Sequence, residues 1–226
     1  MKQRFIRIAF ALIAGLSASM AHAVQTGDVY LQGGTQGFGL GYAQPLNQWF
    51  GLRADVNVGS LDHNFTAGDL NYDAHLHLFG VGTYADVFPL SGQGRFLSGL
   101  RLSGGLLFNN DYLSGTATPN ASGNITINGT TYNLPNASVS ARLKEPDVMP
   151  YLGIGWGHQQ TTKRGFGLTA DLGVAFGRPR VDFTASPDVI AAAGAANVAA
   201  EEQNVQNKAG QYHIYPIVQV GLTYRF

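Results

Sequence analysis

The last 16 residues, from Gln211 to Phe226, alternate between two kinds of side chain. Counting back in twos from Phe226, one set holds only Phe, Tyr, Leu, Val, Pro and Ile, whereas the other includes Arg225, Gln219 and His213. Successive side chains of a strand point to opposite sides, so this period of two predicts a strand with one apolar face. Ordinary strands have about 5–6 residues, and tilted membrane strands about 9–11. The pattern favours a membrane strand; a long strand of a soluble, exported β-sandwich is the alternative.

Further segments repeat the alternation. Residues 50–59, 99–108, 152–157 and 166–177 each pair a largely apolar set of positions with a set that is mostly polar or Gly. In residues 72–88 the apolar set changes phase, from Leu76 and Leu78 to Phe79 and Val81. A β-bulge near residues 78–80 would produce such a change, so we predict one there.

Composition limits the class of protein. Only 12% of the residues are charged, about half the share usual for a soluble domain, and the chain has 30 Gly and no Cys. Something other than water is therefore expected to face much of the surface. No apolar stretch reaches the roughly 20 residues of a membrane helix, so a membrane protein with this sequence has to be a closed β-barrel.

Residues 1–23 read as a cleaved secretory signal. Lys2, Arg4 and Arg7 form a basic start, an apolar stretch follows, and Ala21-His22-Ala23 is a small-x-small cleavage site. The predicted mature domain is then residues 24–226. Cleavage removes three of the 14 basic residues and none of the 14 acidic ones, which leaves a net charge of about −3. This charge argues against nucleic acid as a partner.

The final strand, Val220-Gly221-Leu222-Thr223-Tyr224-Arg225-Phe226, carries a family resemblance. With its terminal Phe it resembles the C-terminal signature that the outer-membrane barrel assembly machinery recognises. In overall pattern the chain is similar to the small outer-membrane barrels of Gram-negative bacteria, the group that contains the OmpA, OmpX, OmpW and opacity-type proteins. The resemblance implies an outer-membrane location, contact with outer-membrane lipid and recognition by the assembly machinery through Phe226.

The connections orient this barrel. Such barrels have short periplasmic turns and long external loops. Short turns are predicted near residues 44–48, 89–95 and 158–164, and long connections near residues 61–70, 109–150 and 184–210. Aromatic residues beside the short turns and at the ends of the last strand are expected to form interfacial girdles: Trp49, Phe50, Phe88, Phe96, Trp156, Phe166, Tyr212, Tyr224 and Phe226.

The predicted fold is an all-β, antiparallel, up-and-down transmembrane β-barrel of eight strands. Eight requires the N-terminal stretch to split at Thr35-Gln36-Gly37, and ten is possible if residues 109–150 add membrane strands. Within that connection, Asn128-Gly129 predicts the turn of a short hairpin. Ser186-Pro187 predicts the start of a short Ala-rich helix in the last external loop.

Polar side chains on the other strand faces are expected to point into the lumen. Charges of both signs in a narrow barrel are best explained as a paired interior network, because an unpaired buried charge is costly. A selective channel lining is the alternative, since the many lumen Gly residues could leave space. The predicted network consists of Arg53, Asp55, Asp73, His75, Arg101, Asp171, Gln219 and Arg225.

No motif for catalysis or cofactor binding is found. Asp62-His63 and the pair Asp73 and His75 resemble no catalytic motif, so a membrane-embedded hydrolase is only a remote alternative. His75 and His77 share a strand face, but spacing fixes no third metal ligand. The sequence therefore predicts a non-enzymatic outer-membrane barrel, without cofactor, that has a structural or surface-interaction role. A narrow porin-like channel or a ligand-binding barrel is the alternative, and any solute or external partner is unidentified.

Overall fold

The computed structural model describes residues 27–94, 96–159 and 164–226. The predicted signal segment lies outside these residues. Antiparallel strands dominate, and only short helices interrupt them. The elements are β1 (Asp28–Gly34), β2 (Gly37–Pro45), β3 (Phe50–Ala67), β4 (Leu70–Val87), η1 (Leu97–Gly99), β5 (Leu100–Asn109), β6 (Tyr112–Pro119), β7 (Asn124–Ile127), β8 (Thr130–Asn133), β9 (Val139–Lys144), β10 (Val148–Trp156), β11 (Gly165–Phe176), β12 (Arg180–Ala185), α2 (Pro187–Ala193), α3 (Ala195–Ala209) and β13 (Ile214–Arg225).

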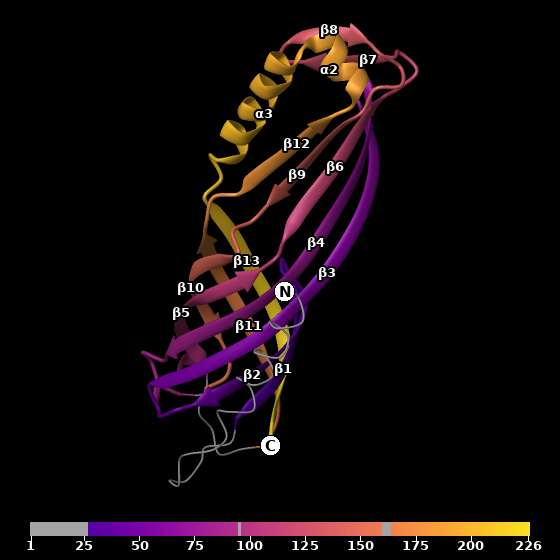
Figure 1. Cartoon of the computed structure of the whole chain (residues 1–226). Helices are drawn as coiled ribbons and strands as arrows, with labels where there is room; N and C mark the ends of the chain where they lie inside the picture. Colours follow the sequence, from indigo (N-terminus) through magenta and orange to yellow (C-terminus); the bar gives the residue numbers. More distant parts are fainter. Residues whose placement is uncertain (1–26, 95, 160–163) are drawn as a thin grey trace, which may run out of the picture.

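Eight strands close into a ring, as the sequence predicted. The order around the barrel is β1, β2, β3, β4, β5, β10, β11 and β13, and β13 pairs back onto β1 (Figure 1). The split of the N-terminal stretch is confirmed, because β1 and β2 are joined by a turn at Thr35 and Gln36. Gly37 follows with a φ of +87°, and a Cβ there would lie 2.2 Å from the carbonyl oxygen of Val58. Only Gly fits this turn.

The predicted long connection at residues 61–70 is largely strand. β3 and β4 each run for 18 residues and continue far beyond the ring. There β4 exchanges β5 for β6 as its neighbour, and β9 and β12 follow. We call this continuation of the same sheet, made of residues 59–67 and 70–78 with β6, β9 and β12, the β extension. Residues 109–150 thus add strands to the extension and none to the barrel, so the ten-stranded alternative is wrong.

The predicted bulge near residues 78–80 is also wrong. β3 pairs with β4 in one unbroken register from Phe50 opposite Val87 to Ala67 opposite Leu70. The apolar phase changes because the surroundings of the sheet change. In the ring the outer face is apolar and the inner face polar, whereas in the extension the outer face carries Asp62 and His75 and the inner face Leu61 and Leu76. The inversion marks where the strands leave the membrane.

A small separate hydrophobic core lies at the tip of the extension. The predicted hairpin is present as β7 and β8, and the predicted helix as α2 and α3, which Gly194 separates with a φ of +80°. α2 lies at the tip near the hairpin, and α3 runs from the tip down along β12 (Figure 1). Their shared core consists of Ile125, Ile127, Ala137, Ala185, Val189 and Ala193.

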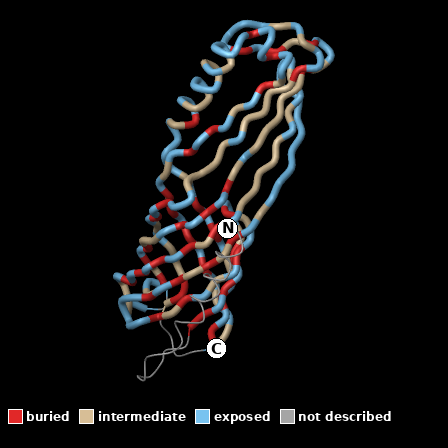
Figure 2. The backbone as a smooth tube through the Cα atoms, in the orientation of Figure 1, coloured by how far each residue is buried: buried red, intermediate tan, exposed pale blue. Residues whose placement is uncertain are grey.

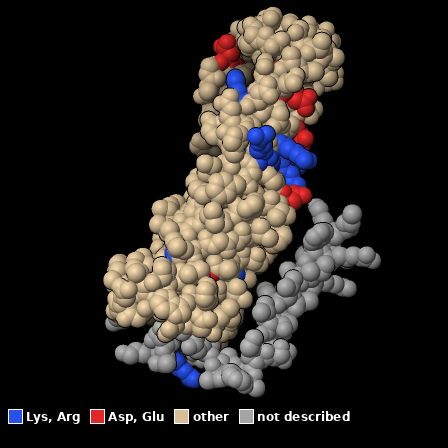
Figure 3. Space-filling view, turned by 90° about the vertical axis from the view of Figure 1, so that its left-hand side faces the viewer, with Lys and Arg blue, Asp and Glu red and all other residues tan. Residues whose placement is uncertain are grey.

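The outer surface of the barrel is apolar. Phe38, Phe166 and Leu222 are 79%, 85% and 58% exposed, although such side chains are usually buried in a soluble protein. In Figure 3 the barrel surface is almost free of Lys, Arg, Asp and Glu. Among the described residues, no helix has both the length and the apolar character needed to cross a membrane.

Candidate functional site

The middle of the lumen is filled by two arginines and two aspartates. Arg53 from β3 donates to Asp86 on β4, with Nε 2.6 Å from Oδ2, and also reaches Asp171 on β11 at 3.2 Å. Arg101 from β5 donates to both oxygens of Asp171 at 2.7 and 2.8 Å. Ser103 donates a hydrogen bond to Asp86 at 2.5 Å. We call these two arginines and two aspartates the central ion network; their charges sum to zero within the lumen.

A second ion group closes the end of the barrel at which the chain terminates. Arg225, next to the last residue, donates to Asp28 at the start of β1 through Nε at 2.5 Å and Nη2 at 2.8 Å. Nδ1 of His158, in the turn after β10, lies 3.3 Å from Oδ2 of the same carboxylate. Nearby, Asp55 accepts a hydrogen bond from Tyr30 at 3.0 Å. All of these side chains are buried.

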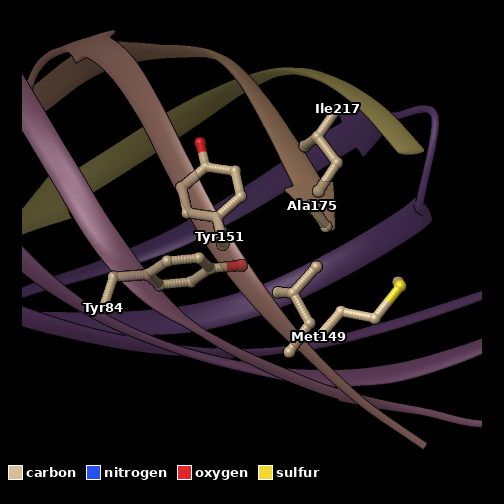
Figure 4. Close-up of a cluster of buried hydrophobic side chains, with 6 residues drawn as sticks. Tyr84, Met149, Tyr151, Ala175 and Ile217 are labelled. Carbon is tan, nitrogen blue, oxygen red and sulfur yellow. The ribbon is translucent and has the colours of Figure 1, made fainter. Parts of the chain in front are cut away.

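An apolar cluster seals the end of the lumen beneath the extension. Figure 4 shows Tyr84 and Tyr151 directed toward one another, with Met149, Ala175 and Ile217 beside them. The two rings meet edge to face, with centroids 5.1 Å apart. Arg53 of the central ion network lies 4.6 Å from the centre of the Tyr84 ring. Apolar and ionic layers are therefore stacked along the barrel axis in direct contact.

The lumen glycines do not leave empty space. A Cβ on Gly153 or Gly173 would lie 2.2 or 2.4 Å from atoms of the Tyr151 ring, and one on Gly41 would lie 2.3 Å from Tyr30. Each glycine makes room for a tyrosine. The cavity that remains beside Arg53, bordered by Gln32, Gln219 and both tyrosines of the apolar cluster, has a volume of about 10 Å³. This is about the space of one water molecule.

Six members of the predicted network lie buried in the barrel, and two do not. Asp73 and His75 belong to the outer face of the extension, because β4 has already left the ring there. His75 pairs with Asp62 across the strands and is partly exposed. The two residues border an open depression of about 540 Å³. The buried members are Arg53, Asp55, Arg101, Asp171, Gln219 and Arg225.

Sequence reasoning missed two carboxylates of the lumen ion groups, Asp28 and Asp86, and the buried His158. Asp86 shares a face with Tyr84 and alternates with the outward Val87. The apolar alternation that begins at Phe79 therefore predicts that Asp86 points inward. Asp28 meets Arg225 because the first and last strands of a closed barrel pair. His158 lies in a turn, where strand alternation gives no information about direction.

Seven of the nine predicted girdle residues surround the end of the barrel with the short turns, Tyr212 lies at the opposite end of the last strand as expected, and Phe88 does not face outward. Phe88 is only 2% exposed: its neighbour Val87 faces outward, so Phe88 turns inward beneath Gly51. Tyr212, 75% exposed, precedes β13 at the opposite end of the barrel. Trp156 is partly buried and donates through Nε1 to the carbonyl oxygen of Phe96. The exposed members near the short turns are Trp49, Phe50, Phe96, Phe166, Tyr224 and Phe226.

The extension offers a different kind of surface. An apolar row on its inner face runs in register across all five strands. Leu61 at the β3 edge is 63% exposed, whereas Val181 at the other edge is buried, and α3 lies against β12 there. Residues 60–67 of β3 are all exposed, and Figure 2 shows this stretch in pale blue. The row consists of Leu61, Leu76, Leu113, Leu143 and Val181.

The free edge of β3 in the extension is a row of backbone groups without a neighbouring strand. Beyond Val58, β3 pairs with β4 on one side only, because β2 ends its pairing there. Within the part of the chain that the structure describes, residues 60–67 make no backbone hydrogen bond outside that pairing. Phe65 stacks on Tyr72 at 5.0 Å and on His63 at 5.8 Å, so aromatic contacts join the edge strand to β4.

Solved structures show what this architecture is similar to. CarO2 from Acinetobacter baumannii aligns over 91% of this chain and 100% of its own, with a TM-score of 0.67 and 18% identity. CarO from the same organism aligns over 90% and 98%, with a TM-score of 0.62 and 18% identity. The fold is that of the outer-membrane β-barrels. No protein-family model matches the sequence, and no curated protein matches it significantly.

Proposed function

We propose that this protein is an integral outer-membrane barrel with a closed lumen, and that it acts by holding the β extension at the cell surface for interaction with a partner. The observation that carries the proposal is the filled lumen. The cavity between the central ion network and the apolar cluster has a volume of about 10 Å³, and the ion group at Asp28 lies across the lumen nearer the end with the short turns. A hydrated solute needs far more room than one water molecule occupies.

The charge arrangement also opposes conduction. A selectivity lining presents charges or carbonyl oxygens to a passing ion. Here Asp171 is already paired with Arg53 and Arg101, and Asp86 with Arg53 and Ser103. A passing ion would have to break contacts of 2.5–3.3 Å between buried charged groups. The narrow-channel alternative therefore requires a second conformation of the lumen.

The free β3 edge and the inner apolar row are the surfaces we propose for interaction. An exposed edge strand can receive an extended segment of another polypeptide, whose main chain supplies the missing hydrogen bonds. The inner row beside it would receive alternate apolar side chains of that segment. A partner strand bound at this edge would pair the side of β3 that is free in the extension.

The proposal includes three finer claims: an outer-membrane location, kinship with the OmpA, OmpX, OmpW and opacity-type barrels, and recognition by the assembly machinery. The final strand ending in Phe226 supports all three. In β13 the outward face is apolar from Ile214 to Tyr224, as a strand inserted into lipid requires. Deletion of Phe226 is expected to lower the folded, heat-modifiable fraction in the outer membrane. An unchanged fraction would argue against recognition through this residue.

Conductance tests the closed lumen. The protein, refolded and inserted into a planar lipid bilayer, is expected to give no reproducible current steps. A porin of known conductance, inserted into the same bilayers, serves as the positive control. Uniform steps from the unaltered protein would refute the closed lumen and favour the channel.

A further inference from the structure

Basic side chains gather at one level of the extension. In the described part of the chain six Lys and Arg side chains are not buried, and four of them lie at the base of the extension. The register places Lys144 of β9 opposite Arg180 of β12, and Arg142 lies two residues away on the same face. Figure 3 shows these blue atoms gathered just above the uncharged surface of the barrel. We call Arg142, Lys144, Arg178 and Arg180 the basic patch.

The patch lies close to the end of the lipid-facing surface. Val148, 49% exposed, begins β10 four residues after Lys144, and Phe176, 40% exposed, ends β11 two residues before Arg178. At about 3.3 Å per residue, Lys144, Arg178 and Arg180 lie within roughly 13 Å of the last outward apolar residue along the chain, and Arg142 within roughly 20 Å. The polar headgroup layer extends about 5–8 Å beyond the hydrocarbon core on each side, and the long side chains of Lys and Arg reach back toward it.

The patch is only partly neutralised by its own neighbours. Asp147 accepts a hydrogen bond from Lys144 at 2.7 Å, and its pKa is lowered by Lys144 and by Arg180. Asp182 stands opposite Arg142 in the register. Two carboxylates thus face four cations.

The guanidinium of Arg142 is also held in place. It lies 3.7 Å from the centre of the Tyr112 ring, whose ring centroid lies 4.8 Å from that of His77. A cation stacked on an aromatic ring keeps its N–H groups free to donate at the ring edge. The patch therefore combines excess positive charge with at least one positioned donor group.

We propose that the basic patch binds the phosphate groups of lipid headgroups in the leaflet that surrounds the base of the extension. The inference rests on the proposed outer-membrane location. Positive side chains near an anionic lipid surface attract it, and arginines suit phosphate because two parallel hydrogen bonds form. Anchoring of this kind would fix the tilt and rotation of the extension above the membrane. The apolar band alone resists only movement along the membrane normal.

Native mass spectrometry of the full-length protein, refolded in zwitterionic detergent, tests the site. The probes are bisphosphorylated lipid A and the same lipid without its phosphates. We expect about a tenfold preference for the phosphorylated lipid, because three or four cations act against two carboxylates. The triple variant Arg142→Gln, Lys144→Gln, Arg180→Gln is expected to reduce this preference to below about twofold.

Matched controls separate charge at the patch from charge in general. Arg142→Lys with Arg180→Lys retains the charge and should keep most of the preference, and Arg164→Gln, at the opposite end of the barrel, should keep all of it. Heat-modifiable migration establishes that each variant is folded. An unchanged preference in the triple variant would overturn the site. If millimolar inorganic phosphate displaced the bound lipid A from the patch, free phosphate and not lipid would be its ligand, and the proposal would be overturned. Neither result bears on conductance, so the closed lumen stands or falls separately.

Discussion

Replacing Asp171 by Asn should strongly destabilise the barrel. The carboxylate accepts from Arg101 at 2.7 and 2.8 Å and from Arg53 at 3.2 Å, and all three side chains are buried. In Asp171→Asn two guanidinium groups would face only one carboxylate, that of Asp86. Removal of one partner from a buried ion pair costs about 3–5 kcal/mol, and we expect a loss of unfolding free energy of this size.

Urea unfolding in detergent micelles, followed by heat-modifiable migration, measures the effect. The control is Asp73→Asn, which removes a carboxylate from the exposed outer face of the extension and should change the unfolding free energy by less than about 0.5 kcal/mol. The double variant Arg101→Leu, Asp171→Leu leaves Arg53 and Asp86 as a neutral pair. Its destabilisation should be smaller than the sum of those of its two single variants. Equal urea midpoints for Asp171→Asn and the unaltered protein would refute a dry, paired lumen.

Three further predictions concern the lumen, the base of the extension and its edge. Gly173→Ala places a Cβ 2.4 Å from the Tyr151 ring, so urea unfolding should show a loss of about 1–3 kcal/mol. Burial raises the pKa of Glu145, and the nearby Asp111 raises it further. Folding is therefore penalised where the unfolded carboxyl is already ionised, and Glu145→Gln should raise the urea midpoint at pH 7 but not below about pH 4. Amide hydrogen exchange should be faster in residues 60–67 than in residues 51–58 of the same strand, because only the latter pair on both sides.

Each of these three predictions has a control variant or an outcome that would contradict it. Gly115→Ala meets only one backbone oxygen, at 3.9 Å, and should leave stability unchanged. A gain from Glu145→Gln that persisted at low pH would mean that packing and not charge is responsible. Equal protection along all of β3 would show that another segment covers the edge.

The barrel could be predicted from sequence because lipid enforces a simple rule. Lipid-facing positions are almost all apolar, so the alternation that ends in Tyr224 and Phe226 indicates the strand, its outward face and its class. The turn at Thr35 and Gln36 followed from the need for an even number of strands. The Asn128-Gly129 hairpin followed from local turn chemistry.

The extension could not be predicted in the same way. Once β3 and β4 leave the membrane, the same alternation continues with the opposite polarity, and a local reading takes that inversion for a bulge. The pattern does not say where the surroundings change, so Asp73 and His75 were assigned to the lumen. Contacts between strands, such as those of Arg53 with Asp86 and Asp171, depend on how the barrel closes and on the register of its strands. Neither composition nor the alternation along one strand determines that register.

Single-cysteine labelling in intact cells tests the central claim most directly, because the chain has no Cys of its own. Ala67→Cys lies at the tip of the β3–β4 hairpin, and Gln48→Cys lies in the exposed turn at the other end of the barrel. A closed outer-membrane barrel that presents its extension outward predicts that a membrane-impermeant maleimide labels Ala67→Cys in intact cells, and labels Gln48→Cys only after permeabilisation. Labelling of Gln48→Cys in intact cells, with Ala67→Cys protected, would contradict the account.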